Sequence, residues 1–304
     1  MPTTPVLFVL LATLWGGSFV AIEAGVKEWP PLLFAAVRYD IAGALVLVVA
    51  AVRAGRVLPR TRDDFAAVAV VAVFVVFAHH ALLYVGQESV PGPVAAAVVA
   101  LAPVVTALLA PALVGGEGLG VTGYAGVGVG FLGVVTVTDP GGAGGVAPMG
   151  AALVFAATVA FAVGTLLLRR VSPAISTAAL QGWGMIAGAL LLHFGSRVLG
   201  EPQTASTSPT GLLTLGFLVV GPGVVAFLLY FRLLSSVGAT RTTLVGYLEP
   251  LTAAALAFAA FGYVPRPGAV AGFALVLAGF ALVEGHTVRV LADGAAGRLR
   301  TVLP

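Results

Sequence analysis

The chain has 304 residues, of which 60% are hydrophobic and only 9% are charged, and its net charge is +3 at pH 7. Soluble domains carry about 25% charged residues, so this chain lacks the polar side chains to cover a water-exposed surface, and lipid must be its main solvent. The sequence contains no cysteine, which excludes disulfide scaffolds and thiolate sites, and no basic tract with interleaved aromatic residues points to a nucleic-acid partner.

The first apolar run, residues 6–25, has no basic residue before it. A secretory signal peptide normally has a positive segment followed by a shorter apolar core, so this pattern favours a retained membrane helix. A helix that crosses the lipid core needs about 20 mostly apolar residues. Nine more runs of this kind follow along the chain, between charges and glycine or proline breaks.

Lipid restricts the secondary structure that these runs can adopt. Every backbone amide in hydrocarbon must be paired within its own segment or in a closed barrel, and barrel strands alternate polar and apolar residues over about 10 positions. These runs are continuous and about twice as long, which predicts helices. The predicted helices cover residues 6–25, 31–52, 65–87, 93–114, 121–138, 148–168, 174–195, 210–231, 243–262 and 268–285.

The basic residues are divided unevenly between the two sides of this arrangement. With the N-terminus inside, the inner connections hold 11 of the 15 Lys and Arg residues, the outer ones hold Lys27, Arg197 and Arg266, and Arg38 falls within a helix. Basic residues in short loops favour the cytoplasmic side. We therefore expect a multi-pass protein of the cytoplasmic membrane with both termini in the cytoplasm, including a tail over residues 289–304. The inner residues are Arg53, Arg56, Arg60, Arg62, Arg169, Arg170, Arg232, Arg241, Arg289, Arg298 and Arg300.

An internal duplication is visible in the chain. Residues 100–110 resemble residues 247–257, with Pro103 and Pro250 at matching places. We therefore predict two repeats, residues 1–140 and 146–288, and because each holds an odd number of helices the second enters the membrane from the opposite side, as is typical of secondary transporters. The predicted fold is an all-α membrane protein with ten transmembrane helices in two inverted five-helix repeats. Other matching landmarks are Gly126 and Gly133 with Gly272 and Gly279, and Tyr84 with Tyr230.

Four segments carry a resemblance to a known family. They are Trp15-Gly16-Gly17-Ser18-Phe19, Pro31 followed by Ala36-Val37-Arg38-Tyr39, Leu101-Ala102-Pro103 followed by Gly116-Glu117, and Tyr247-Leu248-Glu249-Pro250. In order and spacing they resemble the drug/metabolite transporter superfamily, specifically the EamA-type exporters. The resemblance covers nearly the whole chain and implies ten helices, an inner-membrane location and efflux of amino acids or other metabolites. The chain departs from the family pattern at Glu23, Asp40 and Tyr263.

Arg38 is an ionisable residue inside a predicted helix. Such a residue usually faces a cavity or a partner, because a charge in lipid costs several kcal/mol. Its guanidinium could bind a substrate carboxylate through two parallel hydrogen bonds. The alternative is a structural ion pair with Asp40, Glu23 or Glu88.

His80 and Tyr84 lie four residues apart on one face of the third predicted helix, while His79 points about 100° away. We expect His80 and Tyr84 to line the substrate cavity, and His80 is a candidate for proton coupling because histidine titrates near neutral pH. A hydrogen bond between helices is the alternative. No cluster of further ligands accompanies the histidine pair, so neither a metal nor another cofactor is expected.

Glu249 precedes Pro250 within the ninth predicted helix and is a second candidate for proton coupling. The alternatives are a cap on a broken helix or an ion pair with Arg241. Pro103, Pro222 and Pro250 are predicted hinges, since proline removes a backbone hydrogen bond. Ala102 occupies the place of Glu249 in the first repeat, so any proton role would be asymmetric.

Aromatic residues within the spans complete the predicted substrate site. Trp15, Trp183 and Tyr247 are assigned to it, although aromatic residues are also frequent at membrane interfaces. The glycine pairs Gly126/Gly130 and Gly268/Gly272 favour close packing of the fifth and tenth helices, and a homodimer face is the alternative.

The expected function is secondary transport of a small organic metabolite such as an amino acid, with export favoured and alternating access as the mechanism. An intramembrane lipid-modifying enzyme is the second class, but its dense polar cluster is missing. A channel would require a repeated polar filter. An uptake carrier would use the same residues. The expected partners are the substrate and the bilayer.

Overall fold

The computed structural model describes residues 3–53, 55–115, 118–139, 146–237, 242, 244–283 and 285. Throughout these residues the regular structure is helical, and no strand occurs among them. Eight helices are long and apolar enough to cross a membrane, and two shorter apolar helices follow them. The predicted all-α membrane class is thus confirmed. Glu117, Arg241 and the predicted tail 289–304 lie outside the described residues.

The first half of the chain forms five of the eight long apolar helices. The third of them is one continuous run whose middle part is a π-helix, and the fourth is broken at Ala100 and Leu101. Proline in the first turn begins α2, where its missing N–H is not needed. The elements are α1 (Thr3–Gly25), α2 (Pro31–Val52), α3 (Arg62–Val70), η1 (Val71–Ala78), α4 (His79–Gly86), α5 (Gly92–Val99), α6 (Ala102–Val114) and α7 (Val121–Thr138).

The second half forms three long helices and the two shorter ones. Ser176 and Ser208 cap two of them, because their hydroxyl oxygens accept the backbone N–H groups of Ala179 (3.2 Å) and Gly211 (2.9 Å). The third is again a continuous run with a π-helix in its middle. The elements are α8 (Pro148–Leu168), α9 (Thr177–Val198), α10 (Pro209–Leu218), η2 (Val219–Val225), α11 (Ala226–Val237), α13 (Val245–Phe261) and α14 (Pro267–Val283).

The three predicted hinge prolines occupy different settings. Pro222 lies in η2, between two buried glycines, where the ordinary helical hydrogen bonding is interrupted. Pro103 lies in the first turn of α6, directly after the break that separates it from α5. Pro250 lies inside α13, which continues through it. The matching places of Pro103 and Pro250 in the sequence therefore do not give matching breaks.

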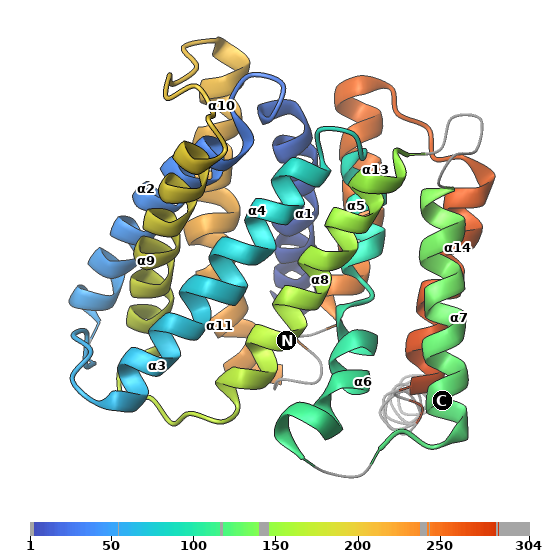
Figure 1. Ribbon diagram of the computed structural model, residues 1–304, viewed down its shortest axis with the longest axis horizontal. Coiled ribbons are helices and arrows are strands. Elements are labelled where there is room, and N and C mark those ends of the chain that lie inside the picture. The colour runs from blue at the N-terminus through green and yellow to red at the C-terminus, as the bar shows by residue number, and fades with distance from the viewer. Residues whose placement is uncertain are drawn as a thin grey trace.

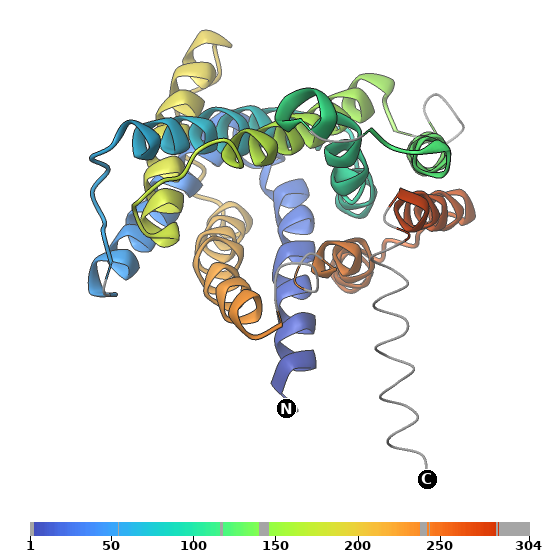
Figure 2. The same cartoon turned by 90° about the horizontal axis from the view of Figure 1, so that it is seen from below.

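The two halves are interleaved in one bundle. The first helix of each half packs on the third and fourth spans of the other half: α1 on α10, α11 and α13, and α8 on η1, α4 and α6. The second helices, α2 and α9, pack on each other, and so do the fifth, α7 and α14. Figures 1 and 2 show α7 and α14 side by side at one edge of the bundle.

Glycines make the contact between α7 and α14. A Cβ on Gly133 would lie 2.7 Å from the carbonyl oxygen of Gly272, and a Cβ on Gly279 would lie 2.6 Å from the carbonyl oxygen of Gly126. The pairing is reciprocal and antiparallel, with Gly126 and Gly133 of α7 opposite Gly279 and Gly272 of α14. Close packing of these helices is thus confirmed, but Gly268 takes little part, since a Cβ there would only reach Thr136 at 3.8 Å.

Gly279→Ala should destabilise the protein, because the added methyl group would collide with the α7 backbone. Overpacking of this kind costs about 1–3 kcal/mol, so the melting temperature of the purified protein in lipid should fall. Gly128→Ala is the matched control on α7, since nothing lies within 4 Å of a Cβ there. Equal melting temperatures for the two variants would contradict the assigned contact.

Candidate functional site

Arg38 lies buried between α2 and α4, with only 5% of its surface exposed. Its Nη1 donates a hydrogen bond to the hydroxyl of Tyr84 at 2.7 Å. The guanidinium carbon lies 4.7 Å from the ring centroid of Tyr39, a distance at which the ring face attracts a cation. The Nε atom is buried without a hydrogen-bond partner. The guanidinium therefore has a donor free.

None of the acids considered as partners of Arg38 pairs with it. Asp40 accepts from His193 of α9 at 2.7 Å. Glu23 faces Lys27 at 3.6 Å and accepts the backbone N–H of Gly92 at 2.7 Å. No ion pair links Glu88 to Arg38. Within the described part of the chain the Arg38 charge has no acidic counterpart, and a buried charge is costly unless it is paired.

His80 connects the Arg38 region to the π-helix η1. Its Nδ1 lies 3.1 Å from the carbonyl oxygens of both Val75 and Val76. A carbonyl only accepts hydrogen bonds, so Nδ1 carries the proton, and in the neutral ring Nε2 accepts. The partner of Nε2 is the hydroxyl of Tyr39, which therefore donates to it. One ring thus joins η1 to the aromatic residue that lies against Arg38.

His79 points to a different helix, as the spacing predicts. Its Nδ1 lies 2.8 Å from the carbonyl oxygen of Ala157 in α8, and its ring packs on Phe161 at 5.4 Å. His79 therefore holds α4 against α8, while His80 faces α2. The described residues contain no group of three or more His, Asp or Glu side chains that could hold a metal ion.

Three of the predicted substrate residues, Arg38, His80 and Tyr84, come together in the structure. With Tyr39 they form what we call the Arg38 cluster. Sequence reasoning missed Tyr39, whose role depends on the packing of α2 against α4. Phe34 and Trp29 extend the row of aromatic rings that begins at Tyr84, which we call the aromatic wall. The ring centroids of Tyr84 and Phe34 lie 5.6 Å apart, and those of Phe34 and Trp29 lie 5.7 Å apart. A small pocket lies elsewhere, among apolar side chains and Arg53 between α2, α9, η2 and α11.

The other predicted residues lie apart from this cluster. Trp15 packs on Tyr230 at 5.6 Å, between α1 and α11. Tyr247 packs on Phe280 of α14 at 4.4 Å. The Glu249 carboxylate makes no ion pair or hydrogen bond among the described residues, while its neighbour Thr252 donates to the carbonyl of Ala12 at 2.8 Å and so ties α13 to α1.

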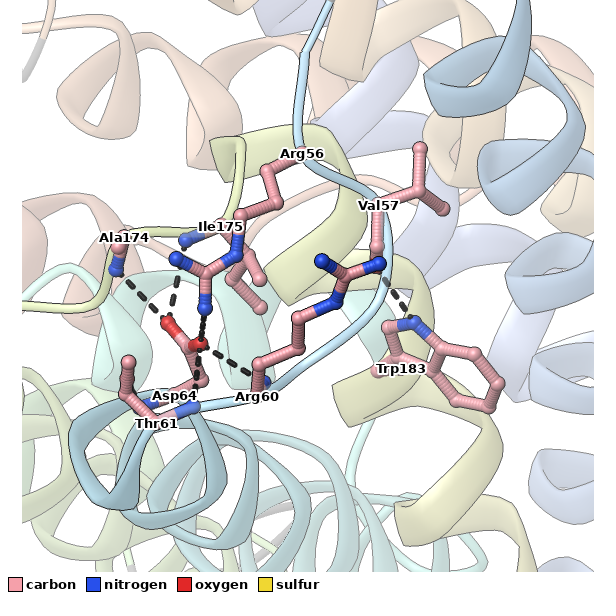
Figure 3. Close-up of polar contacts among 8 residues, drawn as sticks. All are labelled: Arg56, Val57, Arg60, Thr61, Asp64, Ala174, Ile175 and Trp183. Atoms are coloured by element: carbon pink, nitrogen blue, oxygen red, sulfur yellow. Dashed lines mark hydrogen bonds and ion pairs between the residues drawn. The ribbon is translucent and has the colours of Figure 1, made fainter.

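Trp183 belongs to a polar junction at one end of the bundle (Figure 3). Its Nε1 donates to the carbonyl of Val57 at 2.9 Å. Beside it the fully buried carboxylate of Asp64 accepts the backbone N–H groups of Ala174 at 2.7 Å and Ile175 at 3.1 Å. Sequence reasoning did not single out Asp64, although Thr61 and Asp64 have the spacing of a capping box.

Comparison with known proteins identifies the family. The sequence model of the EamA-like transporter family matches the chain twice, over residues 3–138 and 148–284. The uncharacterized inner membrane transporter YedA of Escherichia coli strain K12 is 28% identical over 256 residues, 84% of this chain and 82% of YedA. A probable terminal-alkyne amino-acid exporter of Streptantibioticus cattleyicolor is 28% identical over 286 residues, 92% of this chain and 93% of the exporter. A protein of known crystal structure shares the fold, with a TM-score of 0.64 and 22% identity over 95% of this chain and 99% of its own. With its apolar helices and two family matches, the chain is a multi-pass membrane protein that belongs to the EamA-like transporter family.

Proposed function

We propose that the chain is a secondary transporter that exports a small organic anion or zwitterion, such as an amino acid, across the cytoplasmic membrane. The observation that carries this proposal is the Arg38 guanidinium, which is buried without an acidic counterpart and has its Nε unoccupied. A substrate carboxylate would supply the missing charge and hydrogen-bond acceptor. The family supports transport, and the relative named as a probable terminal-alkyne amino-acid exporter supports this class of cargo.

The mechanism that we propose is alternating access between two five-helix repeats of opposite orientation. Three observations support it: the family model matches twice, helix packing keeps its pattern when the halves are exchanged, and glycines of α7 and α14 pair antiparallel. At 1.5 Å per residue, the 17 residues of α13 and of α14 extend about 25 Å, close to the thickness of the lipid core, so both would complete ten crossings.

The substrate in this proposal contacts Arg38, Tyr84 and the Tyr39–His80 pair. Trp15 and Tyr247 would contribute only after α1 and α13 separate from their present neighbours, and Trp183 has a different role at the end of the bundle. Protonation of Nε2 of His80 would turn this atom into a donor. The Tyr39 hydroxyl could then no longer donate to it, and the Tyr39 side chain beside Arg38 would have to rearrange. This makes His80 the first candidate for proton coupling, ahead of Glu249.

Arg38→Gln should abolish substrate binding while the protein stays folded, because no buried acid is left unpaired by the change. Arg38→Lys keeps the charge but loses the planar fork, so affinity should fall by a factor of about 10, one charge-assisted hydrogen bond. A thermal-shift screen against amino acids and other metabolites would first identify the ligand, which must raise the melting temperature. Flux of that ligand into liposomes would then be compared among the variants.

Arg53→Gln is the matched control, since it removes an exposed guanidinium at the other end of the same helix. It should bind and transport like the parent. A folded Arg38→Gln protein with parental binding would contradict the proposed role of Arg38.

Pro222→Ala should slow transport with little effect on ligand affinity, because the η2 segment would gain a regular helical hydrogen bond and bend less readily. Pro209→Ala, at the start of α10, is the control. Single-turnover flux and equilibrium binding in liposomes separate the two effects. If the Pro222 variant transports as fast as the parent protein, the interruption in η2 has only a structural role and this prediction is wrong.

Both termini should lie in the cytoplasm, because this places most basic residues on that side. A reporter fused after Pro304 should be active only in its cytoplasm-sensitive form. Activity of a reporter that requires the outer side would contradict an even number of crossings.

A further inference from the structure

We infer that two matched latches, one at each end of the bundle, close the two access routes and open alternately during transport. This inference rests on the proposed alternating access. The Asp64 latch consists of Asp64, Arg56, Val57, Ala174, Ile175 and Trp183. The Glu201 latch consists of Glu201, Leu32, Leu33, Trp29 and Gly211.

The Asp64 latch joins the start of the third span of the first half to the start of the second helix of the second half (Figure 3). Oδ1 of Asp64 accepts the N–H groups of Ala174 and Ile175, which precede α9. Trp183 of α9 donates as well, from its indole N–H to the carbonyl of Val57. Backbone and side-chain donors of the second half thus both bind acceptors of the first half.

The Glu201 latch repeats this arrangement with the halves exchanged. Glu201 precedes the third span of the second half, and its two oxygens accept the N–H groups of Leu32 (3.0 Å) and Leu33 (3.1 Å) at the start of α2. Trp29, just before α2, donates its indole N–H to the carbonyl of Gly211 in α10 at 3.2 Å. In each latch a carboxylate of one half accepts backbone N–H groups at the start of the second helix of the other half, and an indole N–H from that other half donates to a backbone carbonyl.

The two latches lie at opposite ends of the packed pair α2 and α9. The Glu201 latch holds the beginning of α2 and follows the end of α9, while the Asp64 latch follows the end of α2 and holds the beginning of α9. Both are formed in this structure. A rocking motion of one half against the other would break the latch at the end that opens and keep the latch at the other end.

The latches differ in strength. Asp64 is fully buried and accepts from five donors, namely the N–H groups of Arg60, Thr61, Ala174 and Ile175 and the guanidinium of Arg56. Glu201 is partly exposed and its carboxylate accepts from two. Partial burial and the nearby Glu201 carboxylate raise the pKa of Glu88, so a like charge also lies beside this latch. The Glu201 end should therefore open first, and with the N-terminus inside it is the outer end.

The test measures the width of each end directly. The chain has no cysteine, so cysteine pairs for spin labels can be introduced without a background. Leu58 with Thr177 spans the Asp64 end, and Glu28 with Thr204 spans the Glu201 end; all are exposed. Distances are measured by pulsed electron paramagnetic resonance on the full chain in lipid nanodiscs.

Asp64→Asn should add a longer-distance population to the Leu58–Thr177 pair and leave the Glu28–Thr204 pair unchanged. Glu201→Gln should do the reverse. Without substitutions, any longer population should occur at the Glu201 end. Arg62→Gln and Arg197→Gln are the controls, because each removes an exposed charge at one of the two ends and belongs to neither latch, and they should change neither pair.

Should Asp64→Asn fail to fold, Trp183→Phe and Trp29→Phe decide, because each removes the indole N–H donor of one latch and keeps an aromatic ring in its place. The inference is overturned if one variant widens both ends equally. It is also overturned if both variants fold and neither widens either end. These distances are measured in the absence of substrate. A failure of the latches is therefore distinguishable from a failure of the proposed transport, which the Arg38 variants test.

Discussion

Lipid gives one apolar helix no hydrophobic reason to prefer another, so this bundle depends on close contact between helix backbones. The chain has 40 glycines, and several lie where any side chain would meet a neighbouring backbone. A Cβ on Gly16 of α1 would lie 2.6 Å from the carbonyl oxygen of Glu249, and a Cβ on Gly92 of α5 would lie 2.7 Å from that of Phe19. These contacts hold α1 against α5 of its own half and α13 of the other, and so place the two halves around a common centre.

Between α2 and α4 the bundle contains a buried charge. Arg38 is held by a tyrosine hydroxyl and an aromatic ring, which attract a cation but do not neutralise it. Aromatic neighbours fix the orientation of the guanidinium while leaving its charge available, whereas an aspartate in the same place would have formed a closed pair. The pairing of Asp40 with His193 and of Glu23 with Lys27 removes the nearby acids from competition. Such an arrangement suits a ligand that arrives with its own negative charge and leaves again.

Features encoded within one segment could be predicted from the sequence. The helices follow from apolar length, the interruption around Pro222 from its flanking glycines, and the close packing of α7 and of α14 from their glycine pairs. What depended on which helices meet could not be predicted. The hydrogen bonds of His80 with Tyr39 and of Trp183 with the Val57 carbonyl depend on how α2, α4 and α9 pack together. The π-helix η1 lies in a run of Val, Ala and Phe that contains no proline or glycine to indicate it. Trp183 was therefore assigned to the substrate site, whereas the structure places it at the end of the bundle.

The Asp64 junction has a consequence for how such a protein can vary. Its acceptor is one side chain, but its donors across the junction are backbone groups of Ala174 and Ile175, which any residue except proline supplies. The exposed side chain of Ala174 can therefore change without weakening these hydrogen bonds, whereas the buried side chain of Ile175 also packs with Ala50 and Ala179. No substitution there could compensate for the loss of Asp64, because the backbone has nothing further to offer. In a comparison of related sequences, such a junction would therefore not show up as two positions that change together. It would show up only as one acidic residue that does not change.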